Sequence, residues 1–397
     1  MSSSLPAGAP AATDRLRRDN SALLLRSLRD DGPASRAALA QRTGLAKATV
    51  STIVADLVAA GAVRDGAAQP EVAATGRSGR PGRPVTLAGS HPVGLGLEVN
   101  VGYLAATALD LSGQVVLSTQ VPLAAEQSGL ARLVALARDS VDRLATDGRK
   151  VLGVTVAVPG QVDLGTGRVI DAPNLQWHDR DVAAVLTQAL GETSVLVDND
   201  ANCAAAGESA FGAARGIADL LYLTGTVGIG AGLVVGGQVR RGAHGLAGEV
   251  GHAPLGEPGR RCVCGRSGCW ETAIGLRALL RETGTEQDLD GRDPVAVAIE
   301  IAARCAVDDT VQAGVGRLAR SLATGLATLA ATLDPQLIVL GGSFVPLGPW
   351  LLPVVTRELD AVSSCRVELS TLGLHAASTG AAAAVLGDVY AGTLALD

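Results

Sequence analysis

One histidine and three cysteines lie close together in the second half of the chain. They are His252, Cys262, Cys264 and Cys269, which fall within eighteen residues. Thiolates and an imidazole are the ligands that zinc takes in closed structural sites, where four protein ligands leave no position for a reactive water. Glycines between the cysteines let the backbone fold tightly enough for these ligands to converge. The spacing therefore predicts a structural Zn²⁺ ion held by these four side chains.

Two other interpretations of this cluster are possible. The four side chains could be small buried groups beside a surface histidine, but the chain has only six cysteines and half of them fall in this one segment. A disulfide is less favoured, because the first residues do not form a secretory signal and Cys262 and Cys264 are too close in sequence to pair comfortably. The clustering favours the metal.

Length and composition bound the class of protein. A chain of 397 residues should hold two or three domains, and with 47% hydrophobic but only 2% aromatic residues its core must be built from Ala, Val and Leu. No apolar run reaches the roughly 18 residues that span a bilayer. The first residues lack a basic segment followed by an apolar one. We therefore expect a cytoplasmic protein with no membrane partner.

The net charge of −6 is distributed unevenly along the chain. Residues 1–90 contain twelve Arg and Lys and seven Asp and Glu, a balance of +5, so the remainder carries −11. A basic N-terminal segment before an acidic remainder indicates that the N-terminal segment contacts nucleic acid, although an ordinary solvated surface would have a similar charge.

The N-terminal residues follow the pattern of a DNA-binding domain. Residues 1–13 lack any periodicity and are predicted to be a disordered lead. A first helix is expected from Asn20, a second after Ser35, which can cap it, and a third over 46–60. The third has an apolar stripe at helical spacing, formed by Val50, Ile53, Val54 and Leu57. Two short helices before a longer amphipathic one favour a helix-turn-helix, with a three-helix packing module as the alternative.

The third helix carries small, hydroxyl and basic side chains away from its apolar stripe. Such side chains allow close approach to base edges and phosphates. The candidates for DNA contact on this helix are Lys47, Ala48, Thr49, Ser51 and Thr52.

A second candidate for DNA contact follows the helices. Arg77, Arg80 and Arg83 alternate with Gly and Pro before extended structure resumes at Val85. Arginines spaced in this way suit a narrow minor groove, whereas the alternative is a flexible basic linker. We therefore expect a winged helix-turn-helix over residues 14–88 with a basic wing or arm.

From residue 91 the chain alternates between strands and helices. The order of three strands, a helix and a further strand occurs in the ribonuclease-H-like lobes of actin-type sugar kinases. A second lobe begins near Asp198 with a strand and a Gly-rich turn. Two α/β lobes are therefore predicted around a cleft. Lobe one comprises about 91–197 plus 380–397, and lobe two about 198–379 with a zinc loop at 248–271.

These motifs together resemble those of the ROK family (repressors, open reading frames, kinases), specifically its DNA-binding regulators. The likeness extends over nearly the whole chain from about Asn20. Its most specific element is the His-x9-Cys-x-Cys-x4-Cys order of the zinc loop. Further matching segments are 197–202, Gly207-Glu208, 333–335 and 340–342.

The resemblance implies roles for single residues. In the family, the acid of the Asn-Asp pair, here Asn199-Asp200, takes a proton from a sugar hydroxyl. Sugar hydroxyls are also bound at the positions of Glu249, His252, Glu271 and Asn174. Carboxylates and amides suit such contacts, because they can form two hydrogen bonds to adjacent hydroxyls. The alternatives are a turn cap for Asp200 and solvated loop acids for the two glutamates.

Both phosphate-binding turns depart from the kinase pattern. The first-strand turn, Asp-x-Gly-x-Thr in the kinases, has Glu98, Asn100 and Gly102 at the corresponding positions, and Val227 replaces a Thr in the second turn. Phosphoryl transfer depends almost wholly on positioning phosphate and Mg²⁺. We therefore expect a protein that binds sugar without phosphorylating it, with Asp200 as a vestigial base and no catalytic residue.

The sequence thus predicts a sugar-responsive transcriptional regulator, a repressor of carbohydrate metabolism genes. Its expected partners are operator DNA and a sugar or sugar phosphate effector in the cleft, and a homodimer or homotetramer is expected because a helix-turn-helix commonly reads paired half-sites. One alternative is an ATP-dependent sugar kinase with a DNA-binding head, since Glu98 could still hold Mg²⁺. Another is a regulator that responds to a partner protein.

Overall fold

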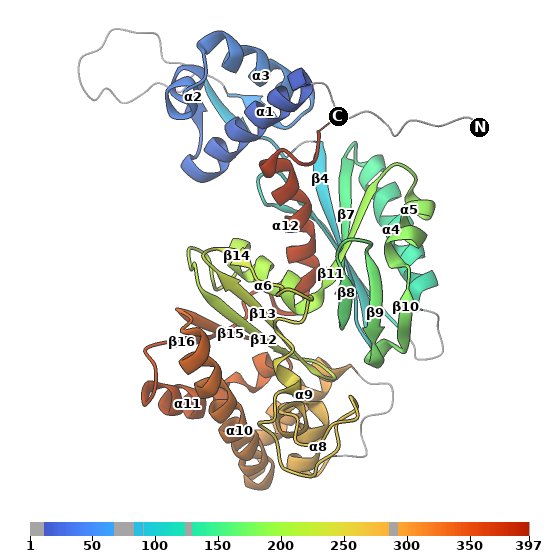
Figure 1. Ribbon diagram of the computed structural model, residues 1–397, viewed down its shortest axis with the longest axis vertical. Helices are drawn as coiled ribbons and strands as arrows, with labels where there is room; N and C mark the ends of the chain where they lie inside the picture. The colour runs from blue at the N-terminus through green and yellow to red at the C-terminus, as the bar shows by residue number, and fades with distance from the viewer. Residues whose placement is uncertain (1–11, 67–82, 90, 124–128, 286–292, 397) are drawn as a thin grey trace.

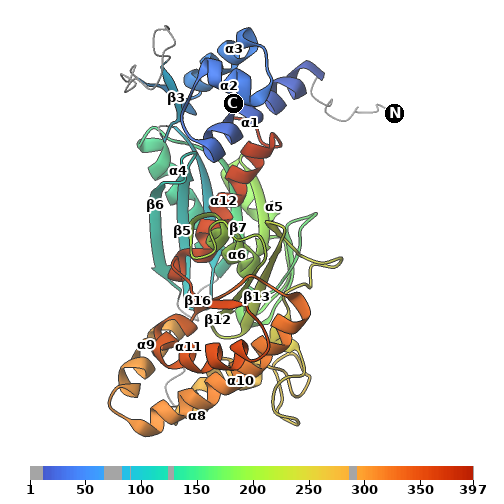
Figure 2. The same ribbon diagram turned by 90° about the vertical axis from the view of Figure 1, so that its left-hand side faces the viewer.

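A computed structural model describes residues 12–66, 83–89, 91–123, 129–285 and 293–396. The chain forms an N-terminal helical domain and two α/β lobes, which follow one another along the long axis of the molecule (Figure 1). The N-terminal domain lies at one end and the second lobe at the other (Figure 2). Among the described residues, no helix combines the length and the apolar character needed to cross a bilayer.

The N-terminal domain is a winged helix-turn-helix, as predicted. Three helices pack beside a small sheet in which β3 lies between β1 and β2. Ser35 caps α2 by accepting a hydrogen bond from the Ala38 N–H at 3.2 Å. The predicted stripe of α3 is buried against the other helices. The elements are α1 (Ala12–Asp31), β1 (Ala34–Ser35), α2 (Arg36–Thr43), α3 (Lys47–Ala59), β2 (Val63–Asp65) and β3 (Pro84–Leu87).

The first helix begins earlier than predicted. It starts at Ala12 rather than near Asn20, so the assignment of residues 12 and 13 to a disordered lead is wrong. The first turns of α1 are rich in charged residues and have few apolar ones, so the spacing of apolar residues does not indicate a helix there. Asp14 lies near the positive end of the helix dipole, and Arg17 forms an ion pair with Asp56 of α3 at 2.8 Å. Residues 1–11 and the predicted wing arginines Arg77 and Arg80 lie outside the described residues.

The first lobe is built on a five-stranded sheet of order β11-β7-β4-β5-β6, as the predicted meander and crossover require. Strand β4 is buried along its whole length because both faces of the sheet are covered. A three-stranded flap of β8, β9 and β10 extends from this lobe. The elements are β4 (Pro92–Val99), β5 (Tyr103–Asp110), β6 (Val115–Pro122), α4 (Gly129–Thr146), β7 (Lys150–Val158), β8 (Gln161–Asp163), β9 (Arg168–Ala172), η1 (Pro173–Leu175), β10 (Trp177–Arg180), α5 (Val182–Leu190) and β11 (Ser194–Asn199).

The second lobe has a sheet of order β14-β13-β12-β15-β16 with helices packed against it. Its core includes Trp270, which is fully buried and directly follows Cys269 in the predicted zinc loop. The elements are β12 (Leu220–Gly225), β13 (Ile229–Val235), β14 (Gln238–Val239), η2 (Val250–His252), α7 (Glu271–Ile274), α8 (Leu276–Thr283), α9 (Pro294–Cys305), α10 (Asp309–Leu333), β15 (Leu337–Gly342), α11 (Phe344–Asp360), β16 (Arg366–Leu369) and η4 (Gly373–His375).

Two helices join the lobes, α6 (Asp200–Phe211) and α12 (Ala376–Ala391). They pack on each other so closely that a Cβ at Gly380 would lie 1.7 Å from the Cys203 carbonyl oxygen. Helix α12 also lies on the first sheet, where a Cβ at Gly96 would lie 1.9 Å from the Ser378 carbonyl oxygen. The predicted lobe boundaries therefore move, because β11 continues the first sheet through Asn199 and α12 contacts that sheet from its first turns.

Candidate functional site

A cavity of about 420 Å³ lies between the two lobes, and we call it the interlobe cavity. The first lobe contributes residues from the turn after β7, the flap and the end of β11, and the second lobe contributes residues from β13 and the segment after β14. The six residues predicted to bind sugar all line it: Asn174, Asn199, Asp200, Glu249, His252 and Glu271. Residues that are up to 97 positions apart in the chain are thus brought to one site.

The Asn199-Asp200 pair stands where β11 ends and α6 begins. Asn199 caps α6 by accepting a hydrogen bond from the Asn202 N–H, and its side-chain amide donates to the Gly160 carbonyl at 3.1 Å. Asn199 therefore has the capping role that was the alternative for Asp200. Burial raises the pKa of Asp200 to about 6, and the negative charge of Glu249 adds to this shift. The pair is held rigidly at the floor of the cavity.

The two ring nitrogens of His252 in the predicted zinc loop lie near different partners. Its Nδ1 lies 3.8 Å from the Cys262 sulfur, whereas its Nε2 lies 4.0 Å from the Glu249 carboxylate. Burial raises the pKa of Glu249, and the neighbouring Glu271 carboxylate raises it further. Glu271 is itself fixed by the Ile229 N–H, which donates to it at 3.2 Å. Three acids thus converge on a cavity that offers hydrogen-bond acceptors.

The four predicted metal ligands form a compact cluster next to this cavity. One donor atom from each of His252, Cys262, Cys264 and Cys269 lies within 4.8 Å of the others. The Cys264 and Cys269 sulfurs are 3.6 Å apart, and all six cysteines of the chain are free thiols. Such a set of donor atoms can hold a metal ion. Glu249 lies three residues before the histidine of the cluster, and Glu271 lies two residues after its last cysteine.

An ion pair that the sequence did not indicate ties the two lobes together behind the cavity. Arg241, in the segment after β14, donates to the Asp198 carboxylate of β11 through Nε and Nη2, at 3.0 and 2.6 Å. Asp198 is 8% exposed and directly precedes the Asn199-Asp200 pair. The pairing places the segment that leads to Glu249 against the first lobe. The residues are 43 positions apart, and no local pattern links them.

We expect Arg241→Ala to destabilise the protein by about 1–3 kcal/mol. Removing one member of a buried pair leaves the other charge without a partner, a loss of about 3–5 kcal/mol that the partial exposure of Arg241 reduces. Urea unfolding measures this loss. The matched control is Arg240→Ala, an exposed neighbour whose variant should unfold at the wild-type urea concentration. Equal stability of the two variants would contradict the assigned role.

Beside Asp200 the space that faces the first-strand turn is nearly filled. A small cavity of about 20 Å³ remains there, lined by residues that include Tyr103 and Tyr222. The Tyr103 hydroxyl donates to the Glu98 carboxylate at 2.7 Å. Burial raises the pKa of Glu98 to about 7. Glu98 therefore lines this small cavity, hydrogen-bonded to an aromatic side chain, and is not among the residues that line the interlobe cavity.

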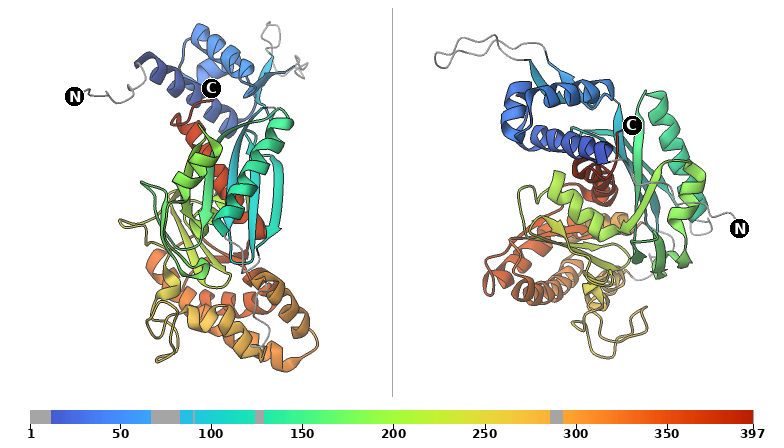
Figure 3. Two further views of the ribbon diagram at one scale, coloured as in Figure 1. Left: turned by 90° about the vertical axis from the view of Figure 1, so that its right-hand side faces the viewer. Right: turned by 45° about the horizontal axis from the view of Figure 1, so that its top comes forward.

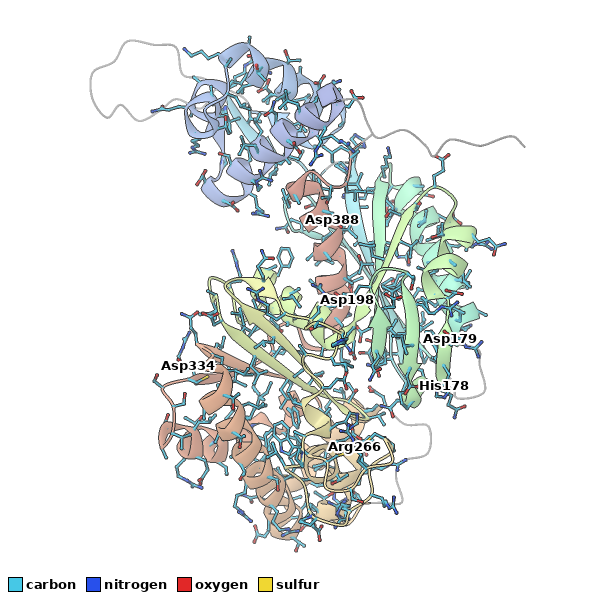
Figure 4. All side chains as sticks on the ribbon, in the orientation of Figure 1. His178, Asp179, Asp198, Arg266, Asp334 and Asp388 are labelled. Carbon is cyan, nitrogen blue, oxygen red and sulfur yellow. The ribbon has the colours of Figure 1, made fainter. Side chains whose placement is uncertain are left out.

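The lining of the interlobe cavity includes charged side chains from both lobes. His178 of the flap lies 2.8 Å from the Asp171 carboxylate, and Arg266 of the cysteine-rich loop lies on the opposite lobe (Figure 4). These three residues were missed by the sequence analysis. The flap strands are only three to five residues long, and no motif marks their side chains.

The predicted DNA-contact residues lie on the outer side of α3. Lys47, Ala48 and Thr52 are exposed, and Thr49 and Ser51 are partly exposed beside the buried stripe. Arg83, the last of the three wing arginines, is exposed at the start of β3. The helix therefore presents the small and hydroxyl side chains that a major groove would require.

Comparison with known proteins agrees with this architecture. A family model described as ROK family matches residues 94–392, and one described as winged helix-turn-helix DNA-binding matches 17–64. The xylose repressor of Bacillus spizizenii is 28% identical over 380 residues, which cover 92% of this chain and 94% of that protein.

Two solved structures extend the comparison. The crystal structure of a ROK family transcriptional regulator, a homolog of the E. coli MLC protein, has a TM-score of 0.78 at 23% identity and covers 95% of this chain and 98% of that one. A ROK family glucokinase from Streptomyces griseus, in complex with glucose and AMPPNP, has a TM-score of 0.63 at 29% identity and covers 74% and 98%. Because the family match spans most of the chain and the winged helix-turn-helix precedes it, the chain belongs to the ROK family.

Proposed function

We propose that the protein is a sugar-responsive transcriptional repressor without kinase activity. The observation that carries the proposal is the convergence of six hydrogen-bonding residues on one interlobe cavity in a chain that also presents a winged helix-turn-helix. A carbohydrate in this cavity would change the affinity of α3 for operator DNA. The relative named as a xylose repressor supports this class of function.

The small cavity beside Asp200 supports sugar binding without phosphoryl transfer. A kinase must place phosphates and Mg²⁺ opposite the base. Here Tyr103 and Tyr222 leave about 20 Å³ beside Asp200, roughly the space of one water molecule. The Glu98 carboxylate is bonded to Tyr103 and cannot turn to a metal without breaking that contact. A coupled ADP-release assay with pentoses, hexoses and N-acetyl sugars tests the kinase alternative.

The spacing of the donor atoms in the cysteine cluster supports a zinc ion. Ligands at about 2.0–2.3 Å from a tetrahedral zinc place two sulfurs about 3.8 Å apart and a sulfur and a nitrogen about 3.5 Å apart. The Cys264 and Cys269 sulfurs are 3.6 Å apart, and the Cys262 sulfur is 3.8 Å from the His252 Nδ1, so both separations lie close to these values. We propose that these residues hold a structural Zn²⁺ through three thiolates and the His252 Nδ1. The ion would keep Nε2 directed at Glu249 and the interlobe cavity.

Helix α12 connects the small cavity beside Asp200, which adjoins the interlobe cavity, to the DNA-binding domain. At its start, Ala376 and Ala377 line the small cavity beside Asp200. At its end, Val389 and Tyr390 share one hydrophobic core with α1, and the two helices are neighbours in both views of Figure 3. Arg26 of α1 donates to the Tyr390 carbonyl. A sugar that changes the lobe arrangement would therefore displace α1 and, with it, the recognition helix.

The proposal is tested with a DNA fragment that the purified protein selects from a random library. Binding of this fragment is measured with and without each sugar of a pentose and hexose panel. We expect at least one sugar to change the affinity by roughly 5- to 150-fold, the usual range of allosteric coupling. The size of the shifted complex reports whether a dimer or a tetramer binds, as we propose. A response to no sugar would favour a regulator controlled by a partner protein.

The contact between α12 and α1 should be required for this response. The Arg29 guanidinium lies 4.6 Å from the centroid of the Tyr390 ring. We expect the double variant Arg26→Ala, Arg29→Ala to retain affinity for DNA and for sugar but to lose most of the sugar-dependent change in DNA affinity. Fluorescence anisotropy of labelled DNA measures both affinities.

The control for this prediction is Arg320→Ala, an exposed arginine of α10 in the second lobe. It removes one positive charge in the second lobe, away from α1, and should leave the response unchanged. A double variant with the full wild-type response would show that the sugar signal reaches the DNA-binding domain by another route.

A further inference from the structure

A second cavity, of about 370 Å³, adjoins the interlobe cavity. Asn174, Val263 and Glu271 line both cavities, so the two spaces meet at these residues. The second cavity extends toward α8 on the side of Glu271, whereas the small space beside Asp200 lies at the other end of the interlobe cavity. A ligand in the interlobe cavity could therefore carry a substituent that extends past Glu271, whereas almost no space remains for one that extends past Asp200.

The walls of this second cavity are rich in positive charge, and we call it the arginine cavity. Four guanidinium groups line it, from Arg260, Arg261, Arg277 and Arg281, against the single carboxylate of Glu271. Arg260 and Arg281 are paired with glutamates that lie outside the lining, Glu257 and Glu282 respectively.

Two of the four arginines keep their charge available. Among the described residues, Arg261 donates to the Gly265 carbonyl alone, at 3.4 Å, and Arg277 is exposed on α8. Within the described part of the chain, neither guanidinium forms an ion pair with an acid. Guanidinium groups bind phosphate and carboxylate in planar pairs of hydrogen bonds, so these two side chains are suited to hold an anion.

The opposite end of the interlobe cavity has the reverse charge. Asp200 and the buried Glu98 both line the small space there. A phosphate directed at Asp200 would lie close to two carboxyl groups in a region shielded from water, where repulsion between like charges is least screened. The anion-binding end and the anion-excluding end of the site are thus distinguished by the side chains.

We propose that the effector carries an anionic substituent, a phosphate or a carboxylate, on the part of the sugar that lies against Glu271, and that Arg261 and Arg277 bind it. This inference rests on the proposed function, because it assigns a ligand class to the same site. The neutral part of the effector occupies the interlobe cavity, and its charged part enters the arginine cavity.

Isothermal titration calorimetry tests the assignment with four probe classes: neutral pentoses and hexoses, their 1-phosphates, their 5- or 6-phosphates, and the corresponding uronic acids. We expect one anionic class to bind at least about tenfold more tightly than its neutral parent, the value of one charge-assisted hydrogen bond. The preference should shrink at high salt. The phosphate and uronic acid arms distinguish the two sources of negative charge.

Arginine variants separate this inference from the proposed function. Arg261→Ala and Arg277→Ala should each reduce the affinity for the anionic sugar toward that of the neutral parent and leave the neutral parent unaffected. Arg320→Ala, outside both cavities, should change neither. Equal binding of neutral and anionic sugars, or an anionic preference that survives both variants, would overturn the inference and leave the proposed function intact. Failure of every probe to bind would contradict both.

Discussion

Replacing Cys262 or Cys264 with serine is expected to remove the proposed Zn²⁺ ion and to abolish the proposed response to sugar at the same time. Both thiols belong to the cluster whose donor atoms lie within 4.8 Å of one another. A hydroxyl is a poor ligand for zinc compared with a thiolate, so a serine at either position leaves three good ligands. The metal content of the purified variants, measured by atomic absorption, should fall close to zero.

The loss of sugar binding follows from what the cluster supports. His252 uses Nδ1 toward Cys262 and Nε2 toward Glu249, so releasing the metal frees the imidazole and the loop that carries Glu249. The Cys262 sulfur is also 3.6 Å from the Glu271 carboxylate, so two of the proposed sugar contacts lose their support. Loss of such orienting partners typically costs 10- to 100-fold in affinity. Calorimetric sugar titration measures this loss.

Cys365→Ser provides the matched control. Cys365 is buried at the end of the second sheet, distant in sequence from the cluster, and its sulfur donates to a backbone carbonyl that a hydroxyl can also reach. This variant should retain both the metal and the sugar response. A Cys262 or Cys264 variant that responds fully to sugar while containing no metal would refute the coupling between the two sites.

The sequence indicates those parts of the site that depend on local spacing. The order of His252 and the three cysteines marks the cluster, and segment 197–202, which resembles a motif of the family, marks Asn199 and Asp200. The stripe from Val50 to Leu57 likewise marks α3, because helical periodicity is read within one element. Each of these features is contained in a stretch of fewer than twenty residues.

The parts that could not be predicted depend on contacts between distant elements. Tyr103 covers Glu98 because of how the turn between β4 and β5 directs two side chains, and a strand pattern does not specify that direction. The pairing of Arg241 with Asp198 depends on the placement of one lobe against the other. The arginine cavity combines α8 with the cysteine-rich loop. Such arrangements follow from tertiary packing, and no pattern within a single sequence predicts which distant residues will come into contact.

Glu249→Ala is expected to abolish the thermal shift produced by the effector without lowering the stability of the free protein. Glu249 lines the interlobe cavity and can accept hydrogen bonds from two neighbouring hydroxyls of a sugar. A hydrogen bond to a charged group contributes about 1.5–3 kcal/mol, so its loss should weaken binding by at least about tenfold. Glu249→Gln, which keeps one acceptor, should bind with intermediate affinity.

The stability of the ligand-free variant distinguishes a binding role of Glu249 from a structural one. Burial raises the pKa of Glu249, and its charge contributes to the raised pKa of Asp200, so the ionised Glu249 is unfavourable in the folded state. A carboxyl whose pKa is raised on folding contributes stability at low pH that is lost as the pH rises through the folded pKa. Removing Glu249 should therefore leave the melting temperature at neutral pH unchanged or slightly raised.

The exposed Glu192 serves as the control, because Glu192→Ala removes an equal charge outside the cavity and should retain the full thermal shift. If Glu249→Ala instead lowered the melting temperature and kept a normal effector shift, Glu249 would be a structural residue of its loop. The interlobe cavity would then bind its ligand without the acid that most clearly defines it. A residue kept at a cost to stability is expected where binding, rather than folding, requires it.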